Sequence, residues 1–222
     1  MDQPGHKPPL KRGYFISFEG TEGGGKSTQI ERLAQRLRLE GYPLRQIREP
    51  GGTLIGEEIR HTLKHSPNNS AMTPEAELLL MNASRAQLVR EVIRPALIAG
   101  EIVLCDRFAD STVAYQGLGR GMGSVQVQSV IDFAVGETWP DLTLLLSVPI
   151  ELSEQRRAQR SSAIQPVRDR FEELDRDFFR RVETGFREIA NANPGRVKVI
   201  DATQTIECIH EVIWGWCQGI LK

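Results

Sequence analysis

Eight residues near the N-terminus have the types and spacing needed to bind phosphate groups. Residues 20–27 read GTEGGGKS and match the pattern G-x-x-x-x-G-K-[ST]. Glycines let successive backbone N–H groups converge on phosphate oxygens, and the N-terminus of a following helix adds partial positive charge. Lys26 could then contact the β- and γ-phosphates, and Ser27 could hold Mg²⁺. The alternative is a glycine-rich turn beside an exposed lysine. Four glycines at a helix start lower stability because they lose much conformational entropy on folding, and in this alternative no bound ligand would compensate for that loss.

Two further segments carry charged residues directly after apolar runs. Asp106 and Arg107 follow the run at 102–105, and Arg48 precedes a Glu-Pro-Gly-Gly-Thr turn. The carboxyl ends of parallel strands meet at the sheet edge where ligands bind, so Asp106 could act through Mg²⁺ and Arg107 could neutralise phosphate charge. A surface ion pair and an ordinary turn remain the alternatives for these segments taken singly.

The stretch from 156 to 170 is rich in arginine and is interrupted by two serines and a proline. Proline disfavours a continuous helix, so we expect a mobile loop between two helices, with a solvated linker as the alternative. With Arg48 and Arg107, arginines then come from three segments, which suits a phosphoryl-transfer site that must bring two polyanions together. The arginines of the stretch are Arg156, Arg157, Arg160, Arg168 and Arg170.

These residues must be held by an alternation of short apolar strands and longer helices. Apolar runs predict strands at 14–19, 44–47, 102–105, 142–147 and 197–200. Helices are predicted at 26–40, at 54–64, from Thr73-Pro74 past Arg94, within 151–191 and near 205–220. This order predicts an α/β fold of the P-loop type, with a doubly wound, five-stranded parallel sheet and helices on both faces.

Composition limits the class of protein. The chain has 222 residues, of which 40% are hydrophobic and 26% charged, as expected for one globular domain over 13–222 behind a flexible tail at 1–12. A net charge of -1 argues against nonspecific nucleic-acid binding, and no apolar run reaches the ~18 residues of a membrane span. Three cysteines without a C-x-x-C pair favour a reducing compartment.

The phosphate-binding pattern alone is shared by kinases, GTPase switches and motor-type ATPases. A GTPase switch should carry the base-reading sequence Asn-Lys-x-Asp, which this chain lacks. A motor-type ATPase is usually a larger protein, and its arginine finger lies in a different sequence context. The residues therefore favour a kinase.

Several motifs, taken in order, resemble the thymidylate kinase family, whose members phosphorylate dTMP to dTDP with ATP. The likeness covers nearly all of residues 14–217, and its most specific part is DRFADSTVAYQG at 106–117. The other matching motifs are FEG at 18–20, REPGGT at 48–53, RAQ at 85–87, PDLT at 140–143 and DRFE at 169–172.

The resemblance implies a division of residues between two nucleotides. The residues implied for ATP are Gly20, Thr21, Glu22, Gly23, Gly24, Gly25, Lys26, Ser27 and Thr28. Those implied for dTMP are Glu22, Arg48, Met81, Arg85, Arg107, Thr112, Tyr115 and Gln116. Lys26, Arg48, Asp106, Arg107 and Arg160 would be catalytic, and Ser27 and Asp106 would hold Mg²⁺, Asp106 through water.

Within the dTMP site, the resemblance gives each side chain a different task. Arg85 would read the thymine edge, and Thr112 and Gln116 would help fix the base. Tyr115 would crowd the 2′ position and exclude ribonucleotides, while Glu22 would lie near the 3′-hydroxyl.

Met81 departs from the family pattern, because its position usually carries a phenylalanine that stacks on thymine. It lies four residues before Arg85 and therefore on the same helix face. A thioether can replace such a contact with about 0.3–1.5 kcal/mol. The alternative is that Met81 belongs to the core.

The resemblance also makes the arginine-rich stretch, about 156–170, a lid that closes on ATP and excludes water. The P-loop has Gly23-Gly24 where one branch of the family carries a basic residue, and in the bacterial branch the lid supplies that charge. Arg160 is the first candidate, with Arg156 and Arg157 behind it. A cytoplasmic homodimer is implied as well. The alternative functions are another nucleoside monophosphate or deoxynucleoside kinase, and a non-catalytic ATP-binding protein.

Overall fold

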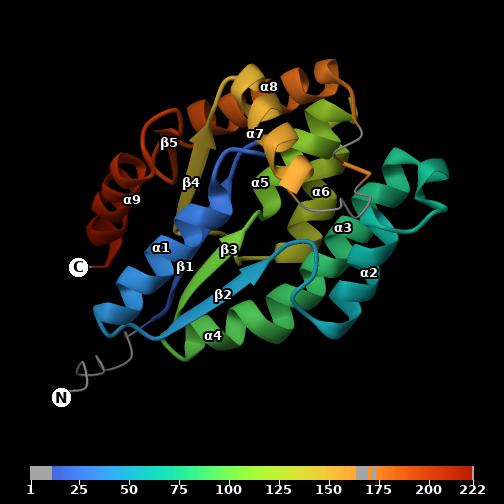
Figure 1. The fold of residues 1–222 in the computed structure, drawn as a ribbon. Coiled ribbons are helices and arrows are strands. Elements are labelled where there is room, and N and C mark those ends of the chain that lie inside the picture. Colours follow the sequence, from blue (N-terminus) through green and yellow to red (C-terminus); the bar gives the residue numbers. More distant parts are fainter. Residues whose placement is uncertain (1–11, 164–169, 172–173, 222) are drawn as a thin grey trace.

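The apolar runs form one parallel sheet in the computed structural model, which describes residues 12–163, 170–171 and 174–221 (Figure 1). The strand order is β2-β3-β1-β4-β5, so the chain first fills one side of β1 and then the other. The predicted doubly wound, five-stranded α/β fold is confirmed. The strands are β1 (Tyr14–Glu19), β2 (Leu44–Arg48), β3 (Ile102–Asp106), β4 (Leu142–Ser147) and β5 (Val197–Asp201).

Helices lie on both faces of the sheet (Figure 1). Within the described residues, none is long and apolar enough to cross a membrane. In the first half of the chain they are α1 (Lys26–Leu39), α2 (Leu54–Lys64), the 3₁₀-helix η1 (Asn69–Ala71), α3 (Pro74–Leu88), the π-helix η2 (Val89–Ile93) and α4 (Arg94–Ile98). In the second half they are α5 (Ala109–Thr112), the π-helix η3 (Val113–Gly119), α6 (Ser124–Val135), α7 (Ile150–Ala163), α8 (Arg176–Ala192) and α9 (Ile206–Ile220).

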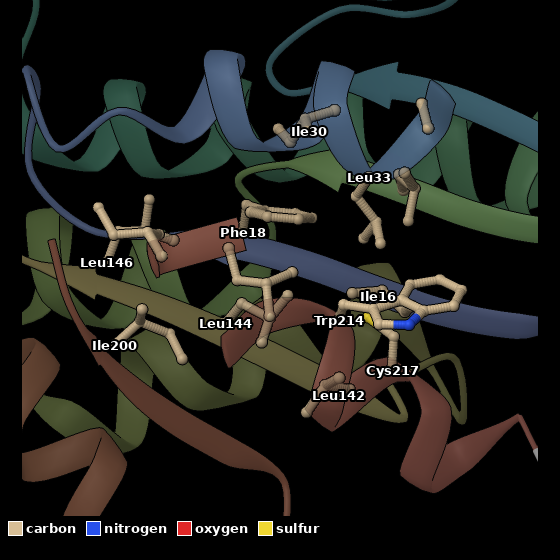
Figure 2. Packing of buried hydrophobic residues seen from close by; sticks show 14 of the residues in the cluster. Ile16, Phe18, Ile30, Leu33, Leu142, Leu144, Leu146, Ile200, Trp214 and Cys217 are labelled. Atoms are coloured by element: carbon tan, nitrogen blue, oxygen red, sulfur yellow. The ribbon is translucent and has the colours of Figure 1, made fainter. Parts of the chain in front are cut away.

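The period-two alternation of β1 divides its side chains between two hydrophobic clusters. Ile16 and Phe18 pack with α1 and α9, where Trp214 of α9 approaches the sheet (Figure 2). Phe15 points to the opposite face and packs with residues of α3, η2 and α6. Because a large apolar side chain contributes about 1.5–3 kcal/mol when fully buried, a one-residue slip of β1 would be strongly opposed.

The long third helix is continuous but not uniform. Thr73 caps α3 by accepting a hydrogen bond from the backbone N–H of Ala76, and Pro74 occupies its first turn, both as predicted. The helix then passes through the π-helical η2 into α4. Pro95, which has no N–H to donate, lies at the start of α4 and accounts for the widened turn before it.

Two segments differ from the sequence-based expectations. No element is predicted from the apolar pattern between 106 and 135, yet α5, η3 and α6 lie within this stretch. A π-helix takes more residues per turn than an α-helix, so the spacing in η3 does not match the helical pattern. The start of the predicted loop at 156–170 is also helical, because α7 continues to Ala163. Residues 164–169 of that stretch lie outside the described residues.

Candidate active site

The carboxyl ends of β1, β2 and β3 meet beside a cavity of about 550 Å³. The register aligns Asp106 with Phe18 on one side and with Arg48 on the other. The segments that follow the three strands therefore reach the same cavity. Of the predicted site residues, those that line it are Glu22, Gly23, Gly25, Lys26, Ser27, Thr28, Arg48, Met81, Arg85, Asp106, Arg107, Thr112, Tyr115 and Gln116.

Lys26 lies inside the main chain of the P-loop, residues 20–27. Its Nζ donates to the carbonyl oxygens of Gly20 at 3.1 Å and Thr21 at 2.9 Å. Burial and the charge of Arg107 lower the pKa of Lys26 to about 8, partly offset by Glu22. An anion bound at this point would favour the charged ammonium, so phosphate binding and full protonation of Lys26 reinforce each other.

Two of the P-loop glycines, Gly20 and Gly23, stand where no side chain fits. Gly20 has φ +128°, and a Cβ there would lie 2.3 Å from the carbonyl oxygen of Leu146. Gly23 has φ +77°, and its Cβ would lie 2.8 Å from the carbonyl oxygen of Ser153 in α7. The Ser153 hydroxyl donates to the Glu22 carbonyl at 2.6 Å, and the guanidinium of Arg156 donates to the Gly23 carbonyl at 3.3 Å. Helix α7 is thus packed directly against the P-loop.

Ser27 and Asp106 bring two hard oxygen donors together at the start of α1 and the end of β3. The Ser27 hydroxyl donates to Asp106 Oδ2 at 3.3 Å. Oxygen ligands of this kind suit Mg²⁺, which usually takes few protein ligands and completes its shell with water and phosphate. The described residues contain no group of three or more His, Cys, Asp or Glu side chains that could hold a metal by themselves. The pair therefore fits a metal that arrives with a nucleotide.

Arg107 connects the P-loop with the segment after β3. Its backbone is left-handed (φ 69°), the only such non-glycine residue among those described, and its N–H donates to the Phe18 carbonyl at 2.9 Å. Its guanidinium donates to the Gly20 carbonyl at 3.0 Å, to Ser111 Oγ at 3.1 Å and to Glu22 Oε1 at 2.9 Å. Although burial acts in the opposite direction, the charges of Arg107 and Lys26 hold the pKa of Glu22 well below its usual range.

Glu19, the last residue of β1, holds the turn that carries Arg107. Its carboxyl group accepts from the Phe108 N–H at 2.7 Å and from the Ser111 hydroxyl at 2.5 Å. Burial, reinforced by the negative charge of Asp110, raises the pKa of Glu19 to about 7. Sequence reasoning did not single out this residue, since a strand-end glutamate before a P-loop gives no sign of its distant partners.

Arg48 is already paired in this structure. Its guanidinium makes a bidentate contact with Glu57 of α2, both N···O distances being 2.9 Å, and Glu57 also accepts from the Gly52 N–H at 2.7 Å. The two side chains are about half exposed. A bidentate carboxylate has the geometry of a phosphate, so Arg48 is oriented for an anion at this position.

Arg85 is more enclosed than its predicted role requires. Its Nε and Nη2 contact Glu49 Oε2 at 2.8 Å and 2.7 Å, and Nη1 donates to Asn82 Oδ1 and Thr112 Oγ1, both at 2.9 Å. Nη2 also donates to the Phe108 carbonyl at 3.1 Å. All three guanidinium nitrogens therefore have protein partners, and a ligand that engages Arg85 would have to compete with these contacts.

Met81, Tyr115 and Gln116 also line the cavity. Met81 also packs against the hydrophobic cluster that contains Tyr115, so it belongs to the core and to the cavity wall. The Tyr115 hydroxyl is buried without a hydrogen-bond partner of good geometry among the described residues, and burial raises its pKa to about 12. The side-chain amide of Gln116 donates to Glu77 Oε1 at 2.9 Å.

Comparison with known proteins identifies the family to which this architecture belongs. The family model described as thymidylate kinase matches residues 18–213. The chain belongs to the thymidylate kinase family. It is 44% identical to the thymidylate kinase of Thermomicrobium roseum over 94% of this chain and 96% of that one, and 46% identical to that of Syntrophotalea carbinolica over 90% and 93%. The crystal structure of thymidylate kinase from Ehrlichia chaffeensis superposes with a TM-score of 0.73 at 31% identity, and covers 92% and 99% of the two chains.

Not every predicted residue of this family site reaches the cavity. Gly20, Thr21 and Gly24 do not line it; the carbonyl groups of Gly20 and Thr21 instead accept hydrogen bonds from Lys26. The side chain of Arg160 lies outside the described part of the structure, as do Arg168 and Asp169.

Conversely, several lining residues escaped sequence reasoning. Arg60 and Lys64 lie on the face of α2 that also carries Glu57, and their spacing of three and four residues could have revealed a charged helix face. The remaining lining residues belong to motifs that carry the family resemblance but had no role assigned to them: Glu49, Pro50, Ser111 and Phe171.

Proposed function

We propose that this chain transfers the γ-phosphoryl group of ATP to dTMP, giving ADP and dTDP, in a single cavity with a donor end and an acceptor end. The observation that carries the proposal is the continuity of the cavity. Lys26 and Ser27 of the P-loop line one end, Thr112 and Gln116 line the other, and Arg107 lies between them. Two nucleotides bound end to end would meet at Arg107.

At the donor end, the P-loop backbone N–H groups and the N-terminus of α1 hold the ATP phosphates. Lys26 exchanges its carbonyl partners, Gly20 and Thr21, for phosphate oxygens. Ser27 and Asp106 would hold Mg²⁺, Asp106 through water, and Thr28 lines the cavity next to them. When bound, Mg²⁺ would supply positive charge that neutralises the phosphate oxygens.

Transfer itself needs positioning and charge stabilisation rather than a covalent intermediate. The guanidinium of Arg107 contacts the Gly20 carbonyl and Glu22 of the P-loop and also Ser111 of the segment that reaches the acceptor end. It can therefore contact the γ-phosphoryl group and the acceptor phosphate at once. A fixed cation at this point stabilises the charge that spreads over both groups in the transition state.

At the acceptor end, Arg48 exchanges the carboxylate of Glu57 for the dTMP phosphate. Arg85 and Thr112 hold one edge of the base, and Gln116 holds another. Met81 packs against the ring in place of an aromatic side chain. Tyr115 fills the space at the 2′ position, and Glu22 lies at the 3′-hydroxyl.

The lid supplies a further positive charge to ATP. Arg156 is the described lid residue that lines the cavity, and it donates to the P-loop carbonyl of Gly23. Arg160 follows one helical turn later in α7. We propose that both serve the transfer, as in the lid-arginine branch of the family. Separate Arg156→Ala and Arg160→Ala variants should each lower kcat, and a variant with unchanged kcat would remove that arginine from the assignment.

The proposal also covers the domain organisation, the oligomeric state and the cellular location of the protein. Residues 13–222 form one domain, with 1–12 as a tail and the lid at about 156–170. The enzyme acts as a cytoplasmic homodimer on small molecules, without nucleic acid or membrane as a partner. Sedimentation analysis at micromolar concentration tests the dimer, and a monomer would contradict it.

The activity is tested by measuring ADP formation from ATP and Mg²⁺ with a panel of acceptors: dTMP, dUMP, UMP, dCMP, AMP, GMP and thymidine. We expect strong preference for dTMP, since the base end carries Arg85, Thr112 and Gln116 together. Preference for another acceptor would keep the chemistry and overturn the substrate assignment. ATP binding without turnover on any acceptor would overturn the enzymatic assignment.

A further inference from the structure

Glu77 is a buried carboxylate that the proposed reaction does not use. It lies in the first turn of α3 and is completely buried. An acidic residue in this position would normally remain in solvent and complement the helix dipole. Burying a carboxylate is costly unless its oxygens are paired, so its surroundings should reveal what it does.

Three side chains from two separate segments surround Glu77. Oε1 accepts from Gln116 Nε2 at 2.9 Å and from Arg120 Nε at 3.1 Å. Oε2 accepts from Arg120 Nη2 at 2.8 Å and from Arg170 Nη1 at 2.6 Å. Each oxygen thus has two donors, which uses the acceptor capacity of a carboxylate.

The two arginines fix the carboxylate in place. Arg120 binds both oxygens, and Arg170 is itself anchored by a second hydrogen bond to the Met72 carbonyl at 3.1 Å. Rotation of Glu77 would break contacts with two largely buried guanidinium groups, which is strongly unfavourable. The carboxylate therefore presents a rigid acceptor to Gln116.

A rigid acceptor determines which way the Gln116 amide faces. A carboxylate cannot donate, so the amide must turn its NH₂ group toward Glu77, and the reverse orientation would bring two oxygens together. The described residues give the Gln116 Oε1 atom no hydrogen-bond partner, although the side chain is almost fully buried and lines the cavity. Oε1 is therefore the amide atom left for a ligand.

We propose that Glu77 is a positioning residue for base specificity, which orients Gln116 so that its carbonyl oxygen accepts a hydrogen bond from the acceptor nucleobase. This inference rests on the proposed base site. Thymine and uracil carry an N3–H donor, whereas cytosine has an unprotonated acceptor at N3. A fixed acceptor in the protein selects the first class and rejects the second, because two facing acceptors leave a buried group unpaired.

The decisive variant is Glu77→Gln, which keeps the shape of the side chain and allows it to donate as well as accept. Gln116 could then turn and present its NH₂ group to the cavity. We expect the ratio of kcat/KM for dTMP to that for dCMP to fall about ten- to a hundredfold, with an absolute rise for dCMP. General loosening of the site would lower both values and would not raise dCMP turnover.

Arg120→Gln is the matched control. It removes one of the two ion pairs, but Arg170 still holds Oε2 and Oε1 still accepts from Gln116, so the carboxylate stays in place as an acceptor, and Arg120 does not line the cavity. Its dTMP/dCMP ratio should match that of the wild type, even where its melting temperature is lower. If the dTMP/dCMP ratio fell equally in Glu77→Gln and Arg120→Gln, the proposal would be overturned. The fall would then come from the lost ion pairs and not from the orientation of Gln116.

Two further variants keep the proposal testable. If Glu77→Gln shows no cooperative unfolding and is therefore not folded, Glu77→Asp takes its place. Aspartate retains the charge, but its shorter side chain withdraws the carboxylate from Gln116. The dTMP/dCMP ratio of Glu77→Asp should fall several-fold, and an unchanged ratio would overturn the proposal.

Gln116→Leu tests the proposed base site separately from the positioning role of Glu77. If Gln116→Leu lowers the ratio and folded Glu77→Gln does not, the positioning role is wrong; if Gln116→Leu has no effect, the proposed base site is wrong as well.

Discussion

At the P-loop end of the cavity, a phosphate would meet main-chain atoms, whereas at the base end a ligand would meet buried side chains held by other side chains. The P-loop end depends on Gly20 and Gly23, which have no space for a Cβ, and on Lys26, which donates to two carbonyl groups. The base end depends on Arg85 held by Glu49 and on Gln116 held by Glu77. The first is fixed by local chain conformation, and the second by contacts between distant segments.

This difference predicts how each end should respond to substitution. Displacing the main chain should weaken ATP binding and leave base selectivity intact. Removing a supporting side chain at the base end should change selectivity and leave ATP binding intact. Arg107, which contacts both ends, should affect the transfer step most of all.

Arg107→Ala should have the largest effect on activity. We expect kcat to fall about 10²–10³-fold, because the variant loses a fixed cation between the two nucleotides. The Kd for ATP should change only a few-fold, since the P-loop main chain is retained. Steady-state kinetics and ATP titration check the two quantities, with Arg45→Ala as the control because Arg45 pairs with Glu101 and does not line the cavity. Small and equal changes in kcat and Kd would contradict the assignment.

Glu19 lies between the two ends and should make stability depend on pH. Its pKa is raised by burial and by Asp110 from 4.5 to about 7. Between these values only the folded protein keeps the proton, so the contribution of Glu19 to stability is fully present below pH 4.5 and is lost as the pH rises through 7. Glu19→Gln should therefore gain up to about 3 kcal/mol relative to wild type between pH 5 and pH 8. Denaturant unfolding at both pH values measures this, and a constant difference would show that Glu19 does not titrate in that range.

Gly20→Ala should disturb the donor end through the main chain. Its Cβ would lie 2.3 Å from the Leu146 carbonyl oxygen, so the P-loop must move away from β4. We expect a loss of about 1–3 kcal/mol in the free energy of unfolding together with weaker ATP binding. The dTMP/dCMP selectivity should stay at the wild-type value. Gly215→Ala, where nothing lies within 4 Å of the added Cβ, should leave ATP binding unchanged.

Tyr115→Ala should have the smallest of these effects on activity, a change in sugar selectivity, although loss of a buried ring also lowers the free energy of unfolding by about 3–5 kcal/mol. Loss of the ring opens space at the proposed 2′ position, so the ratio of kcat/KM for dUMP to that for UMP should fall about tenfold. Tyr115→Phe keeps the ring and should keep the ratio. Equal discrimination in all three proteins would remove Tyr115 from the sugar site.

The donor end could be predicted from sequence because its determinants are contiguous. Glycines, Lys26 and Ser27 occur within eight residues, and the strand before them and the helix after them have regular periods. Asp106 and Arg107 could be predicted as site residues for a similar reason, since they come directly at the end of an apolar strand.

The supporting contacts could not be predicted, because they join residues far apart in the chain. Glu77 and Arg170 are 93 residues apart, and nothing in the first turn of a helix indicates a buried carboxylate. Residues Val113–Gly119 were also missed as a helix, because a π-helix with two glycines has neither the period nor the composition of an ordinary one. The pairing of Arg48 with Glu57 depends on how α2 folds back over the turn after β2.

The contact between Gly23 and α7 also limits how this enzyme can evolve. A basic residue at position 23 would have to pass the Ser153 carbonyl, 2.8 Å from its Cβ, and would need a left-handed backbone. A single substitution there would disrupt the P-loop before it could supply useful charge. A basic residue at position 23 therefore requires α7, which also carries Arg156, to shift away from the P-loop. If the lid supplies the ATP-facing charge as proposed, a substitution at position 23 alone gives no direct route to a P-loop charge, and this packing and the lid arginines should be kept together.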